Sequence, residues 1–195
     1  MKKWIDLLKL LFRAGKYRFV QDRPEFRFMM QKIRKGAVVI DIGAHKGGYS
    51  FWMKEAIGKE GKLIAFEPQE KGYLILKDLF KQSNVTLENM AVSDTEETRT
   101  LYIQPQQNIV SYEASLENKY EDPDQAFVRT TTIDRYCSKH NIIPGFIKID
   151  VEGHELQVIQ GARDTLTTHH PGLLVEAEAR HIGEEKLSAL FKLLQ

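Results

Sequence analysis

From residue 36 onward, short apolar runs alternate with stretches in which apolar side chains recur every three or four positions. The runs that predict strands are 38–42, 63–66, 85–92, 145–150 and 172–178. The stretches that predict helices are 49–57, 71–82, 156–168 and 184–194. This alternation predicts a Rossmann-like, doubly wound α/β fold, in which a mostly parallel sheet is covered by helices on both faces.

Two further segments, 99–103 and 127–133, are rich in Thr, Val, Ile and Tyr and predict an added β-hairpin or pair of edge strands. Directly after them, Asp134 is expected to cap a short helix that runs through Ser138. The polar stretch 104–125 lies between the two strands and is either a disordered loop or a functional one. In the functional case, we expect four of its side chains to contact the substrate: Asn108, Ser111, Tyr112 and Ser115.

The first 35 residues differ from the rest of the chain in charge. They hold 11 Lys or Arg against 3 Asp or Glu (+8), whereas residues 36–195 hold 17 against 24 (−7). Residues 3–16 predict an amphipathic helix, and residues 25–34 predict a second short helix. One face of the first helix is apolar and carries Trp4, Leu7, Leu8, Leu11 and Phe12. We therefore divide the chain into a basic helical extension, 1–35, and a Rossmann-like domain, 36–195.

The basic extension has three possible uses. It packs on the domain with its charges in solvent, it docks on an anionic membrane surface, or it attracts a negatively charged substrate. No nucleic-acid motif accompanies the charge, so we expect no nucleic-acid partner. No run approaches the ~20 apolar residues that cross a bilayer, and a signal-peptide cleavage site is missing. The single cysteine, Cys137, excludes an internal disulfide, and together these features predict a cytoplasmic protein.

A glycine-rich turn follows the first strand of the predicted sheet, and an acid, Glu67, ends the second. A doubly wound sheet holds an adenosine ribose with this pair of features. In the dinucleotide fingerprint a second glycine lets the backbone approach a pyrophosphate, but His45 occupies that place here. The turn therefore argues against NAD or FAD and favours S-adenosylmethionine, which carries no phosphate. We expect Asp41 to bind its ammonium group and Glu67 its ribose hydroxyls.

Ionisable side chains also follow the strand at 145–150, where Asp150, Glu152, His154 and Glu155 stand within six positions. Such a set can bind a metal, orient a hydroxyl or accept its proton. It can also be a solvated helix N-terminus, where acids are favoured by the helix dipole. The acids show no fixed metal-ligand spacing, so we predict no metal site.

Taken in order, four motifs resemble the FkbM-type methyltransferases: Asp41-Ile-Gly-Ala-His-Lys-Gly47, Phe66-Glu67-Pro68, Asn89-Met-Ala-Val-Ser-Asp94 and Ile147-Lys-Ile-Asp-Val-Glu-Gly-His-Glu155. The resemblance covers residues 36–178, although His45 stands where the family usually has Asn. It implies an S-adenosylmethionine-dependent enzyme that mostly methylates hydroxyls on sugars or other small molecules. It places the cofactor against residues 43–47, Glu67 and the turn at 89–91, with Asp150 facing the methyl and substrate side. The full set that we predict at the cofactor is Asp41, Gly43, Ala44, His45, Gly47, Ser50, Glu67, Pro68, Asn89, Ala91 and Asp150.

For catalysis we predict His154 as the base that takes the acceptor's proton, because an ordinary imidazole pKa of ~6.5 suits neutral pH. Asp150 or Glu152 would orient His154 or bind the substrate, which would be a small-molecule or glycan hydroxyl. The alternative is a catalytically inactive binding or assembly module that keeps the fold.

The resemblance also bears on the end of the chain. Methyltransferases of this kind add two antiparallel strands after the helix predicted at 184–194, whereas this sequence stops at Gln195. We therefore expect either a C-terminally truncated domain or one that manages with five core strands, and its last strand, 172–178, then has an uncovered edge. Such an edge favours self-association and predicts a homodimer.

Overall fold

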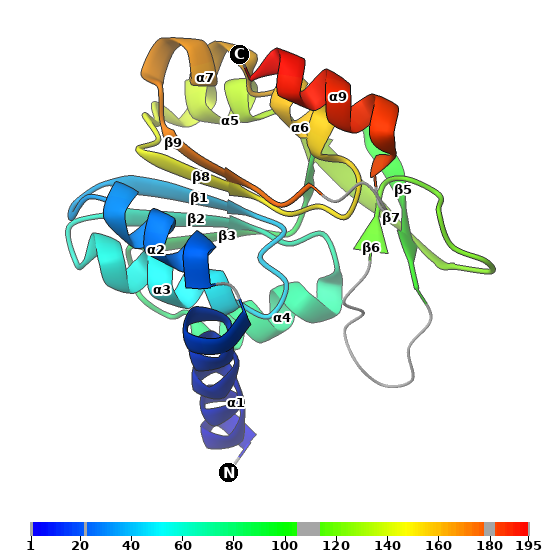
Figure 1. Cartoon of the computed structure of the whole chain (residues 1–195). Coiled ribbons are helices and arrows are strands. Elements are labelled where there is room, and N and C mark those ends of the chain that lie inside the picture. Colours follow the sequence, from blue (N-terminus) through cyan, green and yellow to red (C-terminus); the bar gives the residue numbers. More distant parts are fainter. Residues whose placement is uncertain (1, 22, 105–113, 178–181, 195) are drawn as a thin grey trace.

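The computed structural model describes residues 2–21, 23–104, 114–177 and 182–194 (Figure 1). Five parallel strands form the central sheet in the order β3-β2-β1-β8-β9. They are β1 (Val38–Ile42), β2 (Lys62–Phe66), β3 (Val85–Glu88), β8 (Phe146–Ile149) and β9 (Gly172–Val175). The predicted α/β fold with a mostly parallel sheet is confirmed, and its strand order reverses between β1 and β8.

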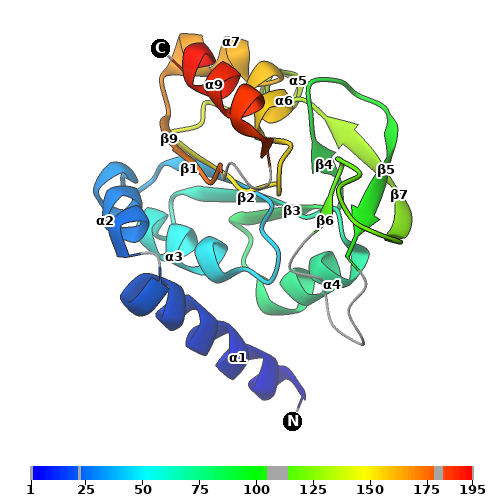
Figure 2. The same cartoon turned by 45° about the vertical axis from the view of Figure 1, so that its right-hand side comes forward.

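Helices cover both faces of the sheet (Figures 1 and 2). One face carries α2 (Arg23–Lys32), α3 (Gly48–Ile57) and α4 (Glu70–Leu79). The other carries α5 (Ile133–His140), α6 (Glu155–Gln160), α7 (Arg163–His169) and α9 (Glu184–Leu193). The N-terminal helix α1 (Lys2–Lys16) and a π-helical turn (Tyr17–Gln21) add a further layer outside α3 and α4. Among the described residues, no helix is both long and apolar enough to cross a membrane.

The core explains why the central strands read as unbroken apolar runs. Strands of a parallel sheet are buried on both faces, so their side chains are apolar at successive positions rather than alternate ones. Ile40, Ile42 and Phe66 pack against the helices of one face, whereas Val39 and Leu63 pack against α2 and α3 on the other. All five side chains are buried.

A second, smaller sheet stands beside the carboxyl ends of the central strands (Figure 1). Its order is β4-β7-β5-β6, built from β4 (Ala91–Val92), β5 (Thr98–Ile103), β6 (Ala114–Ser115) and β7 (Asp124–Thr131). β5 and β7 pair antiparallel, so the predicted pairing of these two segments is confirmed.

The prediction of one strand over 85–92 is wrong, because β3 and β4 belong to different sheets. The strand is interrupted at Asn89. The side-chain amide of Asn89 donates to the carbonyl oxygens of Glu67 and Pro68 (2.9 and 3.1 Å). These bonds tie Asn89 to the turn after β2 and let the following residues leave the central sheet. β9 also ends earlier than predicted, at Val175.

Two helix predictions need correction as well. Thr132, not Asp134, caps α5, since Thr132 Oγ1 accepts from the Arg135 amide (3.0 Å). The Asp134 carboxylate instead accepts from the amides of Asp164 and Thr165 at the start of α7 (3.0 and 2.7 Å).

The single helix predicted over 156–168 is two helices, α6 and α7, which are separated at Gly161. A Cβ at Gly161 would lie 2.1 Å from the Ser93 carbonyl oxygen, so this close approach accounts for the glycine at the break.

Candidate active site

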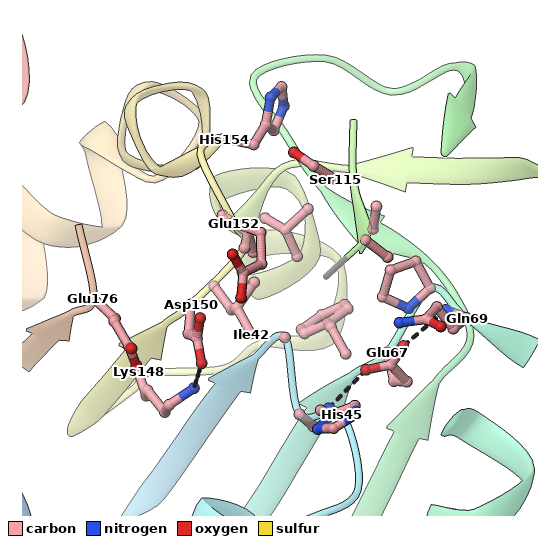
Figure 3. Close-up of a pocket in the computed structure, with 18 of the residues that line it drawn as sticks. Ile42, His45, Glu67, Gln69, Ser115, Lys148, Asp150, Glu152, His154 and Glu176 are labelled. Carbon is pink, nitrogen blue, oxygen red and sulfur yellow. Dashed lines mark hydrogen bonds and ion pairs between the residues drawn. The ribbon is translucent and has the colours of Figure 1, made fainter. Parts of the chain in front are cut away.

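A cavity of about 270 Å³ opens at the carboxyl ends of β1, β2 and β8, where the strand order reverses (Figure 3). Ligands of open α/β sheets bind at this position. Ten of the predicted site residues line it: Gly43, Ala44, His45, Glu67, Pro68, Ala91, Ser115, Asp150, Glu152 and His154.

The turn after β1 approaches the end of β8 very closely. Gly43 has φ +79°, and a Cβ at this position would lie 1.8 Å from the Asp150 carbonyl oxygen. Only glycine therefore lets the turn run beside Asp150. Gly47, at the other end of the turn, is the N-cap of α3 and lies against Leu76 and Phe80 rather than lining the cavity.

Glu67 is held in place before any ligand arrives (Figure 3). Its Oε2 accepts from the His45 amide (2.6 Å), and its Oε1 accepts from the Gln69 amide (2.8 Å). Each carboxylate oxygen can accept a second hydrogen bond. Burial of the side chain raises the pKa of Glu67 to about 7, although the two amides oppose the shift. The protein thus presents an oriented carboxylate that titrates near neutral pH.

His45 lines the cavity as an uncharged side chain. Burial, reinforced by the positive charges of Lys46, Arg13 and Lys148, lowers the pKa of His45 to about 3. Burial likewise lowers the pKa of Lys46, to about 8. His45 also adopts a left-handed φ of 49°, so its place in the turn is strained for a residue with a Cβ.

Asp41 and Ser50, both predicted to contact the cofactor, do not line the cavity. Both are fully buried, and Ser50 Oγ donates to Asp41 Oδ2. Asp41 Oδ1 lies 3.7 Å from the ammonium of Lys148, which in turn lies 3.0 Å from Asp150 Oδ2. Burial disfavours the charge of Lys148, but the carboxylates of Asp150 and Asp41 outweigh it and raise the pKa of Lys148. Asp41 therefore influences the cavity indirectly, because it helps to hold the ammonium of Lys148 beside Asp150.

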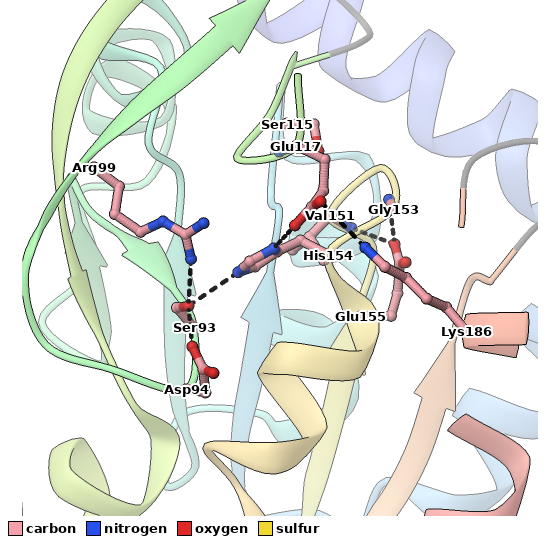
Figure 4. Close-up of polar contacts among 10 residues, drawn as sticks. All are labelled: Ser93, Asp94, Arg99, Ser115, Glu117, Val151, Gly153, His154, Glu155 and Lys186. Carbon is pink, nitrogen blue, oxygen red and sulfur yellow. Dashed lines mark hydrogen bonds and ion pairs between the residues drawn. The ribbon is translucent and has the colours of Figure 1, made fainter. Parts of the chain in front are cut away.

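His154 lines the cavity with both ring nitrogens engaged (Figure 4). Nδ1 lies 2.8 Å from Glu117 Oε1, and Nε2 lies 2.9 Å from Ser93 Oγ. Burial lowers the pKa of His154, while Glu117 opposes the shift. Burial alone would raise the pKa of Glu117, but His154 and Lys186 outweigh this effect and lower the pKa. An ionised Glu117 can only accept, so the neutral imidazole carries its proton on Nδ1 and presents Nε2 as an acceptor.

Asn89 and the four residues predicted to contact the substrate fall in three places. Asn89 lies outside this cavity and clamps the turn that carries Glu67. Ser115 Oγ accepts from the Glu117 amide (3.1 Å) at the cavity wall. Asn108, Ser111 and Tyr112 lie outside the described residues. Within the described ranges, no group of three His, Cys, Asp or Glu side chains is arranged to hold a metal ion.

Several residues that line the cavity were not predicted. Lys148 carried a signal, since a lysine within the apolar run 146–149 must find a charged partner when buried. Glu176 follows β9 in the same way that Glu67 follows β2. Arg13 and Tyr17 come from the N-terminal layer, and nothing in their local sequence indicates that they reach the cavity.

A parallel sheet in this order, with a cavity at its switch point and an oriented acid after β2, places the chain in the class of Rossmann-like proteins that bind a nucleoside-containing cofactor. The sequence profile described as "Methyltransferase FkbM domain" matches residues 41–194. The chain therefore belongs to the FkbM methyltransferase family.

Solved structures share the fold. A methyltransferase FkbM from Methylobacillus flagellatus KT has 17% sequence identity and a TM-score of 0.54, over 97% of this chain and 48% of that chain. A SAM-dependent O-methyltransferase from Thermotoga maritima has 14% identity and a TM-score of 0.53, over 97% of this chain and 55% of that one. The chain thus spans about half the length of these two proteins. No curated protein sequence matches it.

Proposed function

We propose that this protein binds S-adenosylmethionine in the cavity and transfers its methyl group to a hydroxyl of a sugar or another small molecule. One observation carries the proposal: Glu67 is fixed by two backbone amides at the end of β2 and faces the cavity. The remaining lone pairs of its two oxygens suit the two hydroxyls of a ribose. The cofactor would supply an electrophilic methyl group.

Other residues support the same cofactor. Lys46 and Arg13 lie at the glycine turn, where positive charge suits the carboxylate of the cofactor's amino-acid end. The carboxylates of Asp150 and Glu152 line the cavity and suit its ammonium group. His45 leaves little space for the diphosphate of NAD, because its side chain stands where that cofactor needs a bare backbone.

On the acceptor side, His154 is the group that would take the hydroxyl proton, since it lines the cavity. Nε2 of His154 can accept a proton, but it does so only after its contact with Ser93 opens. Alignment of the hydroxyl is the larger contribution that a methyltransferase makes. Replacing the base should lower kcat by ~10² or more while cofactor affinity holds. His154→Ala, measured for both quantities, tests this role, whereas Asp150→Asn and Glu152→Gln should weaken cofactor binding as well.

The first test is calorimetric binding of S-adenosylhomocysteine and of NAD to the wild type and to Glu67→Ala. Loss of charge-assisted hydrogen bonds to the ribose should cost roughly 2–4 kcal/mol, which is about 30- to 1000-fold in affinity. Asn84→Ala is a matched control, since the Asn84 side chain bonds to the carbonyls of Gly58 and Gly61 at the opposite end of the sheet.

The proposal requires binding of S-adenosylhomocysteine that Glu67→Ala weakens and that Asn84→Ala leaves unchanged, with no binding of NAD. Circular dichroism must report a folded chain for each variant. If the folded wild type binds neither ligand, the proposal fails, and a binding or assembly module that keeps the methyltransferase fold becomes the better description.

A further inference from the structure

The N-terminal helix α1 presents apolar side chains on two opposite sides. On its inner side, Leu10 and Ala14 are buried, and Leu10 packs with Leu76 and Phe80 of the α4 region. The Trp52 indole of α3 donates to the Ala14 carbonyl oxygen (2.8 Å), which fixes the helix against the domain. This inner side accounts for the attachment of α1.

The outer side of α1 carries Leu8, Leu11 and Phe12, which are 63%, 43% and 76% exposed. Their spacing of three and four residues puts them on one face of the helix. We call these three residues the outer face of α1. Phe19, in the π-helical turn that follows, is also 60% exposed. Four large apolar side chains in one short segment exceed the scattered exposure that a protein surface ordinarily shows.

Basic side chains flank this outer face. Lys9 and Lys16 are exposed, and they stand three residues before and four residues after Phe12, so both are its neighbours on the helix surface. The first 35 residues carry a charge of +8, whereas the remainder of the chain carries −7. Six of the eleven basic residues in this part of the chain lie between Lys2 and Arg18, in the same stretch as the exposed apolar residues.

We propose that α1 docks on the surface of an anionic lipid bilayer, with its outer face in the acyl boundary and its lysines among the headgroups. A helix with an apolar face and flanking Lys or Arg binds at such an interface, and its affinity combines apolar burial with attraction to anionic lipid. A nucleic acid would use the charge but would leave Leu8, Leu11 and Phe12 in water. An anionic lipid surface would contact both the basic side chains and the exposed apolar side chains.

The same helix borders the cavity on its inner side. Arg13 and Tyr17 line the cavity, and Arg13 Nη1 donates to the Lys46 carbonyl oxygen in the glycine turn (2.7 Å). A Cβ at Gly48 would lie 2.5 Å from the Tyr17 ring, so the π-helical turn rests directly on the start of α3. Docking through α1 would hold the cavity close to the headgroup layer. The docking proposal stands independently of methyl transfer.

Vesicle flotation of the full chain tests this docking. The vesicles contain phosphatidylcholine alone or an equimolar mixture with phosphatidylglycerol, at about 0.05 M and about 0.5 M salt. Phe12→Glu is compared with Phe127→Glu, a matched control because Phe127 is 83% exposed on β7, away from α1. Both side chains are already largely in water, so neither change should disturb folding, and circular dichroism verifies this.

We expect the wild type to bind the anionic vesicles at least about tenfold more tightly than the neutral ones, and to be released by high salt. Phe12→Glu should weaken binding at least about tenfold, whereas Phe127→Glu should bind like the wild type. Failure of the folded wild type to bind anionic vesicles would overturn the proposal, as would an equal loss in both variants. A dimer that Phe12→Glu splits, together with no vesicle binding, would assign the outer face to a second copy instead.

Discussion

At Gly43, the absence of a single methyl group decides whether β1 and β8 can end side by side. The residue combines a left-handed φ with a carbonyl oxygen 1.8 Å from where a Cβ would stand. Gly36 separates these two effects, since it has φ +80° but no heavy atom within 4 Å of the place that a Cβ would take. Substitutions at Gly36 and Gly43 therefore separate the energetic cost of backbone strain from the cost of a close contact.

We predict that Gly36→Ala costs about 1–2 kcal/mol of unfolding free energy, from its positive φ alone. Gly43→Ala should cost at least about 2 kcal/mol more, because the Asp150 carbonyl must also move. Urea denaturation of both variants measures the difference. Equal losses would mean that β8 yields easily at this point and that the contact matters little.

At Glu67, the raised pKa predicts how cofactor affinity depends on pH. Ribose hydroxyls donate to the ionised carboxylate, and with a pKa of about 7 that form is the minor one at pH 6 and the major one at pH 8. Affinity for S-adenosylhomocysteine should therefore be about tenfold weaker at pH 6 than at pH 8. Calorimetry in two buffers of different ionisation heat should detect proton release on binding below pH 7.

Glu67→Gln is the control for this pH dependence, because its amide keeps the size of the side chain and cannot ionise. It should bind more weakly and lose most of the change between pH 6 and pH 8. A wild-type affinity that is flat across this range, or that rises toward acid pH, would contradict the assignment of Glu67 to the ribose.

At the scale of elements, Lys148 joins β1 to β8. Asp41 and Lys148 are register partners on these two strands, and both are buried. Burial raises the pKa of Asp41, while Lys148 and Ser50 limit the rise. Removing one partner of a buried ion pair leaves an uncompensated charge, which typically costs ~3–5 kcal/mol.

We predict that Lys148→Met loses stability by this amount at pH 8 and by less at pH 5. Without the ammonium, the pKa of Asp41 rises further, so the folded state keeps a proton that the unfolded state releases above its ordinary pKa of 3.8. Stability of the variant must then fall as pH rises. Urea denaturation at both pH values checks this, and Asp41→Asn/Lys148→Met should recover much of the loss and remove the pH dependence.

The sequence predicts the central strands well because parallel strands are continuously apolar. It also predicts Glu67 at the cavity, because ligands of such sheets bind beyond the carboxyl ends of the strands. It does not predict the break at Asn89 or at Gly161, since each depends on a contact with a distant carbonyl. The burial of Asp41 beneath the cavity also depends on a distant contact. Its motif position suggests a ligand contact, but its partner Lys148 is more than 100 residues away in the chain.

At the scale of the whole molecule, β9 is the outermost described strand on its side of the central sheet. Its residues, Gly172–Val175, include no charged side chain or proline that would protect an edge. The amide of Gly172 donates to Gly145, directly before β8, and the amide of Glu176 donates to Ile149 of β8. Alternation along the strand therefore turns the amides of Leu173 and Val175 toward the outer edge. The backbone amides of Leu173 and Val175 are therefore the donors through which the predicted self-association would occur.

We predict that the protein forms a concentration-dependent dimer by pairing β9 with β9 of a second copy. Val175→Pro removes an outward amide while leaving the bonds to β8, so it should give a folded monomer. Leu174→Pro should instead destabilise the sheet, because the amide of Leu174 turns toward β8.

Light scattering at high concentration, with circular dichroism for folding, separates these outcomes. A wild type that stays monomeric contradicts the prediction, and a dimer that survives Val175→Pro must use another surface. The outer face of α1 is then the first to test, because Phe12→Glu would split a dimer held there and leave one held by β9 intact.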